Sequence, residues 1–182
     1  MWDKYYEREP HTHKAYGEPF TMRLGAWWLN RPEIKVIEDW GAGFGGFKPL
    51  VAEHQQYVGL DGSASKSADK IVDFEHYSSS VDGAHMRHVI EHNYEWRSVL
   101  HNFLDSFKIR GVLTLFTPFV NTPSVVDKEF DWEGYTMPNI SFNREELEDM
   151  MLEHNLSWTL LDSLPTDTEY GIEHVYLLEK DV

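Results

Sequence analysis

The residues of this chain best placed to do chemistry are three aspartates, each beside a short apolar run. Asp39 follows residues 36–38 and precedes glycines at positions 41, 43, 45 and 46. Asp61 ends the run at 57–60, and Asp73 stands in the run at 70–74. Parallel strands end at one edge of a sheet, and glycines leave backbone N–H groups uncovered there. The pattern therefore predicts a nucleotide pocket.

The position of Asp39 narrows the choice of ligand. The spacing Gly41-x-Gly43-x-x-Gly46, with Asp61 about 20 residues further on, fits the fingerprint of dinucleotide-binding loops. That fingerprint places a pyrophosphate at the loop, and a carboxylate directly before the loop would repel it. The same carboxylate would attract an ammonium group. The acid therefore favours a ligand with an ammonium group and no phosphate over a dinucleotide.

The spacing of apolar residues predicts the elements that hold these aspartates. Strands are expected at 36–38, 57–60, 70–74, 81–89, 112–116, 158–164 and 174–179, and helices at 20–29, 47–54, 94–107 and 143–154. Gly111 is expected to stop the third of these helices. Strands alternating with helices indicate an α/β, doubly wound (Rossmann-like) sheet. We expect a single domain over residues 1–182 with a seven-stranded, mostly parallel sheet, an antiparallel C-terminal hairpin and shortened crossovers after strands 2 and 3.

The amino-acid composition limits the kinds of partner that this protein is expected to bind. The chain has 16 Lys and Arg against 31 Asp and Glu, a net charge of −15, and no basic patch, so a nucleic-acid partner is not expected. It has no cysteine, which excludes disulfides, thiolate metal sites and cysteine nucleophiles. No apolar run approaches the roughly 18 residues that a membrane span needs. These features predict a cytoplasmic protein without a membrane partner.

The stretch from Ile37 to Gly45 resembles motif I of the class I S-adenosylmethionine-dependent methyltransferases, in which two apolar residues and an acid precede Gly-x-Gly-x-Gly. Glu38 departs from this pattern, and Trp40 is bulky where small aliphatic residues are usual. The resemblance covers residues 34–180 in element order and implies S-adenosylmethionine as cofactor. In that family the acid of the second strand holds the ribose hydroxyls, and the acid of the third takes the adenine amine. The cofactor-binding residues implied by the resemblance are Asp39, Gly41, Ala42, Gly43, Gly45, Asp61, Gly62, Asp73, Phe74, Met86 and Arg87.

Residues 81–92 resemble the family's fourth strand and its frequent Leu-Glu-His ending. Methyl transfer from a sulfonium needs mainly alignment and desolvation, so a base matters only for the proton of the acceptor. The candidate catalytic residues are His88, whose ordinary pKa suits proton acceptance near neutrality, and then His92. His88, Glu91 and His92 also spell the motif of inverted zinc proteases. No metal site is expected, because the segment issues from a strand instead of lying on one helix.

The methyl acceptor is the part that the sequence leaves open. Residues 1–32 are aromatic and are predicted to form a helical lid, and residues 119–141 are predicted to form a substrate loop. The resemblance implies methyl transfer, and because the acidic composition and the compact insertions disfavour nucleic acid, we expect the acceptor to be an oxygen or nitrogen of a small, polar molecule. An NAD-dependent oxidoreductase and a non-catalytic S-adenosylmethionine-binding module remain as alternatives, and so does a homo-oligomer.

Overall fold

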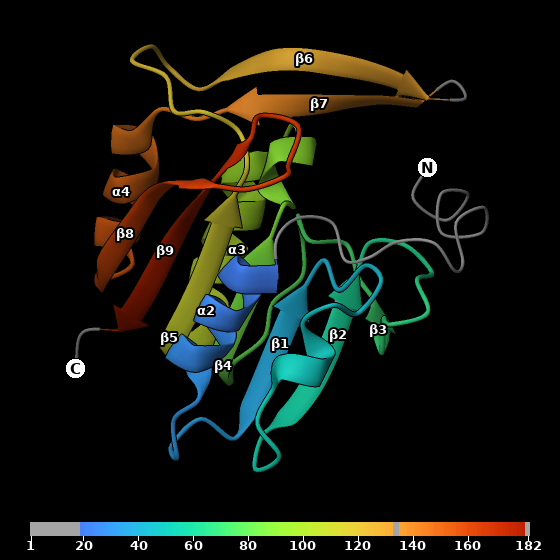
Figure 1. Cartoon of the computed structure of the whole chain (residues 1–182), viewed down its shortest axis with the longest axis vertical. Helices are drawn as coiled ribbons and strands as arrows, with labels where there is room; N and C mark the ends of the chain where they lie inside the picture. The colour runs from blue at the N-terminus through green and yellow to red at the C-terminus, as the bar shows by residue number, and fades with distance from the viewer. Residues whose placement is uncertain (1–18, 133–134, 181–182) are drawn as a thin grey trace.

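The computed structural model describes residues 19–132 and 135–180 (Figure 1). The helices in these ranges are α2 (Pro19–Leu29), α3 (Trp96–Ser106) and α4 (Arg144–Glu153). The strands are β1 (Val36–Trp40), β2 (Gln56–Asp61), β3 (Lys70–Ile71), β4 (Val81–Arg87), β5 (Phe107–Leu115), β6 (Val125–Trp132), β7 (Tyr135–Ser141), β8 (Leu156–Pro165) and β9 (Ile172–Lys180). The first part of the predicted lid, residues 1–18, lies outside the described residues. None of the described helices is long and apolar enough to cross a bilayer.

Seven strands form one sheet in the order β3-β2-β1-β4-β5-β9-β8. The first five are parallel to one another, whereas β9 runs antiparallel to both β5 and β8. The predicted doubly wound sheet and its antiparallel C-terminal hairpin are confirmed. The chain turns from one half of the sheet to the other between β1 and β4, and at such a point the carboxyl ends of the strands leave a crevice.

Helices cover the two faces of this sheet differently. Helices α3 and α4 pack on one face, together with Trp40 and Met86. Helix α2 covers the opposite face, together with Ile37 and Val112 (Figure 1). Because successive side chains of a strand point to opposite faces, Asp39 lies on the same face as Ile37. The first aspartate of the predicted pocket therefore lies on the side that α2 covers.

The half of the sheet that contains β2 and β3 carries little helix. Strands β1 and β2 are joined through a single 3-10 turn, Lys48–Leu50, so the helix predicted at 47–54 is wrong. The side-chain amide of Gln55 donates to the carbonyls of Leu29 and Ile34, which holds this segment as a turn. No helix joins β2 to β3 or β3 to β4 among the described residues, as expected for shortened crossovers.

Strand β5 begins earlier than the sequence predicts. Helix α3 ends at Ser106, and β5 then runs straight through Gly111, which was expected to stop the helix. A Cβ atom on Gly111 would lie 2.6 Å from the ring of Phe107. Glycine is therefore required here because an aromatic ring packs on the strand, and the expectation of a helix stop is wrong.

The segment at 119–141, predicted as a loop, contains a two-stranded antiparallel ribbon of β6 and β7. Pro138 lies inside β7, and proline inside a strand hides the pattern by which strands are predicted. Figure 1 shows the ribbon passing over the end of the sheet at which β5 and β1 terminate. The sequence therefore singled out this segment but did not predict that it folds as a two-stranded ribbon.

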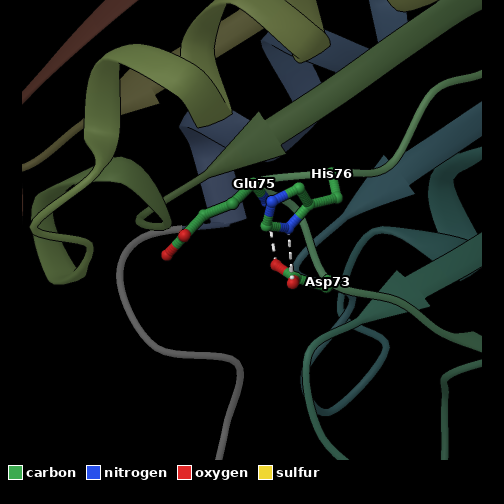
Figure 2. Close-up of side chains that lie close together, drawn as sticks. All are labelled: Asp73, Glu75 and His76. Atoms are coloured by element: carbon green, nitrogen blue, oxygen red, sulfur yellow. Dashed lines mark hydrogen bonds and ion pairs between the residues drawn. The ribbon is translucent and has the colours of Figure 1, made fainter.

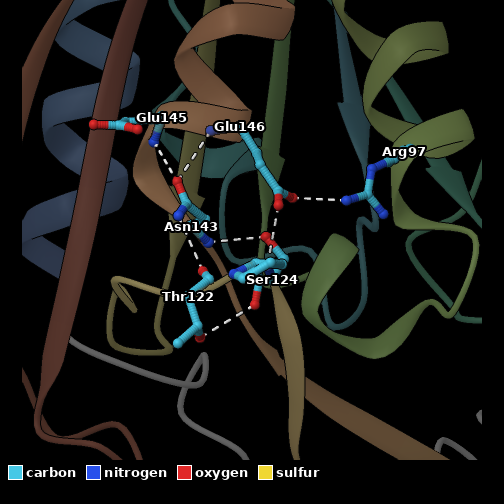
Figure 3. A network of polar contacts seen from close by, with 7 residues as sticks. Arg97, Thr122, Ser124, Asn143, Glu145 and Glu146 are labelled. Carbon is cyan, nitrogen blue, oxygen red and sulfur yellow. Dashed lines mark hydrogen bonds and ion pairs between the residues drawn. The ribbon is translucent and has the colours of Figure 1, made fainter.

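Polar contacts fasten the base of the ribbon to α4 and α3 (Figure 3). The side chain of Asn143 caps α4 by accepting hydrogen bonds from the backbone N–H groups of Glu145 and Glu146, at 2.8 and 3.2 Å. Its own backbone N–H donates to the hydroxyl of Ser124, at 2.8 Å. Glu146 also pairs with Arg97 of α3, at 2.7 Å. These contacts fix where the ribbon leaves and rejoins the domain.

Candidate functional site

A cavity of about 670 Å³ opens at the carboxyl ends of β1, β2 and β4. The glycine loop, Asp39, Asp61 and Phe74 line one part of it. The segment after β4, the β6-β7 ribbon and the β8-β9 connection line the other part. The structure therefore places most of the predicted cofactor residues and both predicted catalytic histidines around one space.

The glycine loop forms the part of the wall nearest β1. Gly41, Gly43 and Gly45 have positive φ angles of 80°, 51° and 77°, a conformation that side chains disfavour. A Cβ atom on Gly41 would also lie 2.3 Å from the side chain of Val89. Gly41, Ala42 and Gly43 line the cavity, as does Gly46, which was not among the predicted contacts. Gly45 lies against Ser67 instead.

Asp61 ties the loop to the next strand. Its buried carboxylate accepts hydrogen bonds from the backbone N–H groups of Gly43, at 2.9 Å, and Ser63, at 3.0 Å. Asp61 and Gly62 also line the cavity. One carboxylate therefore fixes both turns that border the predicted ribose position.

Asp39 lines the cavity but is already paired. One of its oxygens lies 2.7 Å from Nδ1 of His85, and the other accepts a hydrogen bond from the hydroxyl of Tyr57, at 2.8 Å. Burial, followed by the charge of Asp39, raises the pKa of Tyr57 above its ordinary value, so this hydroxyl stays a donor. Asp39 thus keeps a buried, partnered carboxylate at the position where an ammonium group is expected.

His85 was not among the residues predicted from the sequence. It lies directly beside Asp39 on the neighbouring strand β4, and its ring stacks on Phe47 with centroids 3.8 Å apart. A histidine in the middle of a buried strand carries no sequence signal of its own. Only the β1-β4 register shows that it faces Asp39.

Asp73 and Phe74, predicted to contact adenine, differ in their positions. Phe74 lines the cavity and stacks on Trp40 with ring centroids 5.1 Å apart. Asp73 is exposed and borders a smaller depression that shares Gly62 and Phe74 with the main cavity. Figure 2 shows its carboxylate turned toward His76, 2.8 Å away, and this hydrogen bond lowers the pKa of Asp73.

Met86 and Arg87, predicted near the methyl end of the cofactor, point to opposite faces of the sheet. Met86 is fully buried in the core that α3 covers and does not line the cavity. Arg87 does line it, and its guanidinium pairs with the buried carboxylate of Glu173 on β9. Only the second of these side chains reaches the cavity.

The two predicted catalytic histidines lie on the same wall. The ring of Phe116 stands between them, with centroids 4.8 Å from His88 and 5.5 Å from His92. Burial, and then the charge of Arg87, lowers the pKa of His88 to about 4. Burial also lowers the pKa of His92, whose Nδ1 lies 3.0 Å from the carbonyl oxygen of Pro138. Both rings are therefore neutral near pH 7.

Glu91 lies between these histidines in the sequence and does not line the cavity. It is fully buried, and Oε1 accepts the backbone N–H of Phe116, at 2.8 Å. Burial raises the pKa of this carboxyl to about 8. Among the described residues, the group that could share a metal ion is Asp73, Glu75 and His76, all of them exposed. The protease-like motif of His88, Glu91 and His92 does not form such a group.

The β6-β7 ribbon and the β8-β9 connection complete the cavity with residues that the sequence analysis missed. Phe130 and Met137 supply apolar wall, and Asn139 and Glu169 supply polar wall. The amide of Asn139 donates to Glu169, at 3.0 Å, and Lys128 pairs with the same carboxylate, at 2.8 Å. These residues come together only because the ribbon folds over the sheet.

Several solved methyltransferase structures share this fold at low sequence identity. A magnesium protoporphyrin IX methyltransferase from Synechocystis PCC 6803 with bound SAH superposes with a TM-score of 0.63 at 14% identity, covering 90% of this chain and 83% of that one. A putative S-adenosylmethionine-dependent methyltransferase from Listeria monocytogenes superposes with a TM-score of 0.66 at 10% identity, covering 91% of this chain and 100% of that one.

A third similar structure is a 1,6-didemethyltoxoflavin-N1-methyltransferase from Burkholderia thailandensis, with 1,6-didemethyltoxoflavin and S-adenosylhomocysteine bound. It superposes with a TM-score of 0.64 at 15% identity, covering 97% of this chain and 84% of that one. No protein-family model matches the sequence, and no curated protein matches it. At these identities the likeness shows the fold, which is that of the class I S-adenosylmethionine-dependent methyltransferases.

Proposed function

We propose that this protein transfers the methyl group of S-adenosylmethionine to an oxygen or nitrogen atom of a small, polar molecule. The observation that carries this proposal is the cavity at the carboxyl ends of β1, β2 and β4, in which Asp61 holds the glycine loop. The cavity lies at the topological switch point of the sheet, in a fold shared with the solved methyltransferase structures.

The residues around the cavity fit this cofactor. The loop at Gly41 and Gly43 presents backbone without side chains, which leaves room for a nucleoside with a bulky substituent. Asp61 would hold the ribose hydroxyls, and the Phe74 ring offers an apolar surface for the adenine. Asp39 supplies negative charge for the ammonium group of the methionine end. The glycine loop, residues 41–46, contains no basic residue that could hold a pyrophosphate.

An NAD-dependent oxidoreductase receives less support. Its parallel dinucleotide-binding sheet has no reversed strand next to the fifth, whereas β9 of this protein runs antiparallel to β5. The acid before the loop also disfavours a pyrophosphate. A non-catalytic binding module would have no base in its cavity, whereas His88 and His92 line the cavity of this protein.

When bound, S-adenosylmethionine supplies a methyl group on a sulfonium that is a good leaving group. The protein must then exclude water, align the acceptor and take up its proton. Phe116, Phe130 and Met137 give the acceptor part of the cavity apolar walls, and Asn139 and Glu169 give it oxygen atoms. These groups suit an acceptor that bears hydrogen-bond donors, and the carboxylate disfavours an anionic one.

Calorimetry with S-adenosylhomocysteine and NAD tests the cofactor assignment. We expect the first to bind and the second not to. Asp61→Ala should weaken binding of S-adenosylhomocysteine about tenfold or more, because it removes a charged hydrogen-bond acceptor worth about 1.5–3 kcal/mol. Asp69→Ala, which removes a carboxylate that accepts the backbone N–H of Gly59 and does not line the cavity, is the matched control. Failure of the wild-type protein to bind S-adenosylhomocysteine would refute the proposed function.

The acceptor is tested by incubation with S-adenosylmethionine labelled in its methyl group and a panel of small amines, phenols and sugars. We expect label in the small-molecule fraction with a neutral or cationic acceptor. Transfer confined to carboxylic acids, or to added nucleic acid, would contradict the acceptor assignment while leaving the cofactor assignment intact.

A further inference from the structure

We propose that Glu173 is a positioning residue whose carboxylate holds His88 so that Nδ1 of this imidazole accepts the proton that the methyl acceptor loses. The inference rests on the proposed function and extends it. Glu173 lies at the start of β9, far from His88 in the sequence, and belongs to none of the motifs by which the fold is recognised.

The contact between the two side chains fixes the protonation pattern of the histidine. Oε1 of Glu173 lies 2.8 Å from Nε2 of His88, and Glu173 is completely buried. An ionised carboxylate can only accept hydrogen bonds, so a hydrogen bond between these two atoms requires the proton on Nε2 and leaves Nδ1 its lone pair. The contact is short but not aligned as a hydrogen bond, and catalytic hydrogen bonds often align only when ligands are bound.

Arg87 keeps this carboxylate ionised. Its guanidinium, largely buried, donates to the same Oε1 atom of Glu173. Burial alone raises the pKa of Glu173, but the contacts with His88, Arg87 and the hydroxyl of Thr21 hold it below its ordinary value. A buried charge persists only when it is paired. Arg87 is therefore the counterion of Glu173, and an anionic Glu173 is what fixes the tautomer of His88.

The backbone of His88 is also held in an uncommon conformation. Its φ angle is +56°, a left-handed conformation that residues other than glycine rarely adopt. The backbone N–H of His88 donates to the carbonyl of Thr114, at 3.1 Å, and Phe116 packs against its ring. Contacts on backbone and ring together thus maintain a strained residue, which is typical of functional sites.

The second ring nitrogen of His88 is the one available to a ligand. His88 lines the cavity with 12% of its side chain exposed, while its Nε2 is buried. Within the described residues, Nδ1 of His88 makes no hydrogen bond, and it is not one of the fully buried atoms that lack a partner. The charged and titratable groups that face His88 are Arg87, Glu173 and His92.

The proton transfer balances without any further reactant. The bond between the acceptor oxygen or nitrogen and its hydrogen breaks, and the bond to the methyl carbon forms as the carbon–sulfur bond of the cofactor breaks. The proton goes to Nδ1 of His88. The positive charge that then develops on the imidazole lies beside the Glu173 carboxylate. The acceptor must therefore be a hydroxyl or N–H group that keeps its proton until the methyl arrives.

The tautomer of His88 is directly measurable by nitrogen NMR of the full chain labelled in its histidines, with His88→Gln used to assign the signal. At pH 7 we expect a neutral ring with the proton on Nε2. In Glu173→Leu the acceptor is lost, so a population with the proton on Nδ1 should appear. Arg87→Met combined with Glu173→Leu should show the same change without leaving a buried arginine unpaired.

Glu179→Leu is the matched control. Glu179 also lies in β9 and pairs with an arginine, Arg110, at 2.7 Å, but neither residue lines the cavity. This variant should leave the His88 tautomer unchanged. A wild-type proton on Nδ1, or a tautomer unchanged in the Glu173 variants, would overturn the proposal. If neither Glu173 variant folds, the wild-type tautomer decides. Calorimetry with S-adenosylhomocysteine on the wild-type protein tests the proposed function separately.

Discussion

At the scale of single residues, the buried acids Asp39, Glu173 and Glu91 lie in two kinds of environment. Asp39 and Glu173 each face a histidine, and Glu173 also faces an arginine, so their negative charge has a partner. Glu91 is equally buried, but its carboxyl is held by backbone N–H groups, among them that of Phe116, and its Oε2 is among the buried atoms without a hydrogen-bond partner. A carboxyl in such a place is more stable protonated. The difference between the two kinds is testable through pH.

We expect Glu91 to make the protein less stable as the pH rises. Burial raises the pKa of Glu91 to about 8 in the folded state, from an ordinary 4.5. Between these values the folded state binds more protons than the unfolded state, so the free energy of unfolding falls as pH increases. From pH 6 to pH 8 the loss should be about 2 kcal/mol. Glu91→Gln cannot titrate and should lack this loss, which urea unfolding at several pH values measures.

The control for this experiment is Glu145→Gln, which removes an exposed carboxylate from the first turn of α4. Its pH dependence should parallel that of the wild-type protein. An equal loss of stability between pH 6 and pH 8 in Glu91→Gln and in the wild-type protein would show that Glu91 is not the group responsible.

At the scale of elements, the sequence predicts best where a residue acts through its own backbone. The glycine loop and the carboxylates of Asp39 and Asp61 beside it follow from local chemistry, and in the structure they line one cavity. Glu173 and His85 act across the sheet, so they become visible only through strand register. The β6-β7 ribbon was missed because its pairing is with itself and Pro138 interrupts its pattern.

Gly111 shows how packing reassigns a residue that looks like a helix stop. We expect Gly111→Ala to lower the free energy of unfolding by about 1–3 kcal/mol, because its Cβ would lie 2.6 Å from the buried ring of Phe107. Gly62→Ala is the control for stability, since its Cβ would meet nothing closer than 3.9 Å. Denaturant unfolding compares the two. Equal stabilities would mean that Phe107 moves aside at little cost.

At the scale of the whole molecule, the two halves of the sheet are covered unequally. Strands β4 and β5 lie between α2 on one face and α3 on the other, and their central residues are buried. Strand β3 has two exposed residues and is joined to its neighbours without helices. Regions with few buried contacts open at a lower free energy than the core. The glycine loop and Asp61 lie between the well-covered strands β4 and β5 and the sparsely covered strand β3.

Hydrogen exchange should reveal this gradient. We expect backbone N–H groups of β3 to exchange by local opening, much faster than those of β4 and β5, which exchange only when the whole domain unfolds. Addition of S-adenosylhomocysteine should slow exchange at residues 41–46 and 61–63, because the ligand binds the folded loop that Asp61 holds. The β8-β9 hairpin, at the opposite edge of the sheet, serves as the internal reference for global stability. Hydrogen exchange in β3 as slow as in β5 would contradict the conclusion that this half of the sheet is loosely held. An equal gain of protection in the glycine loop and in the β8-β9 hairpin would show that the ligand acts on global stability alone.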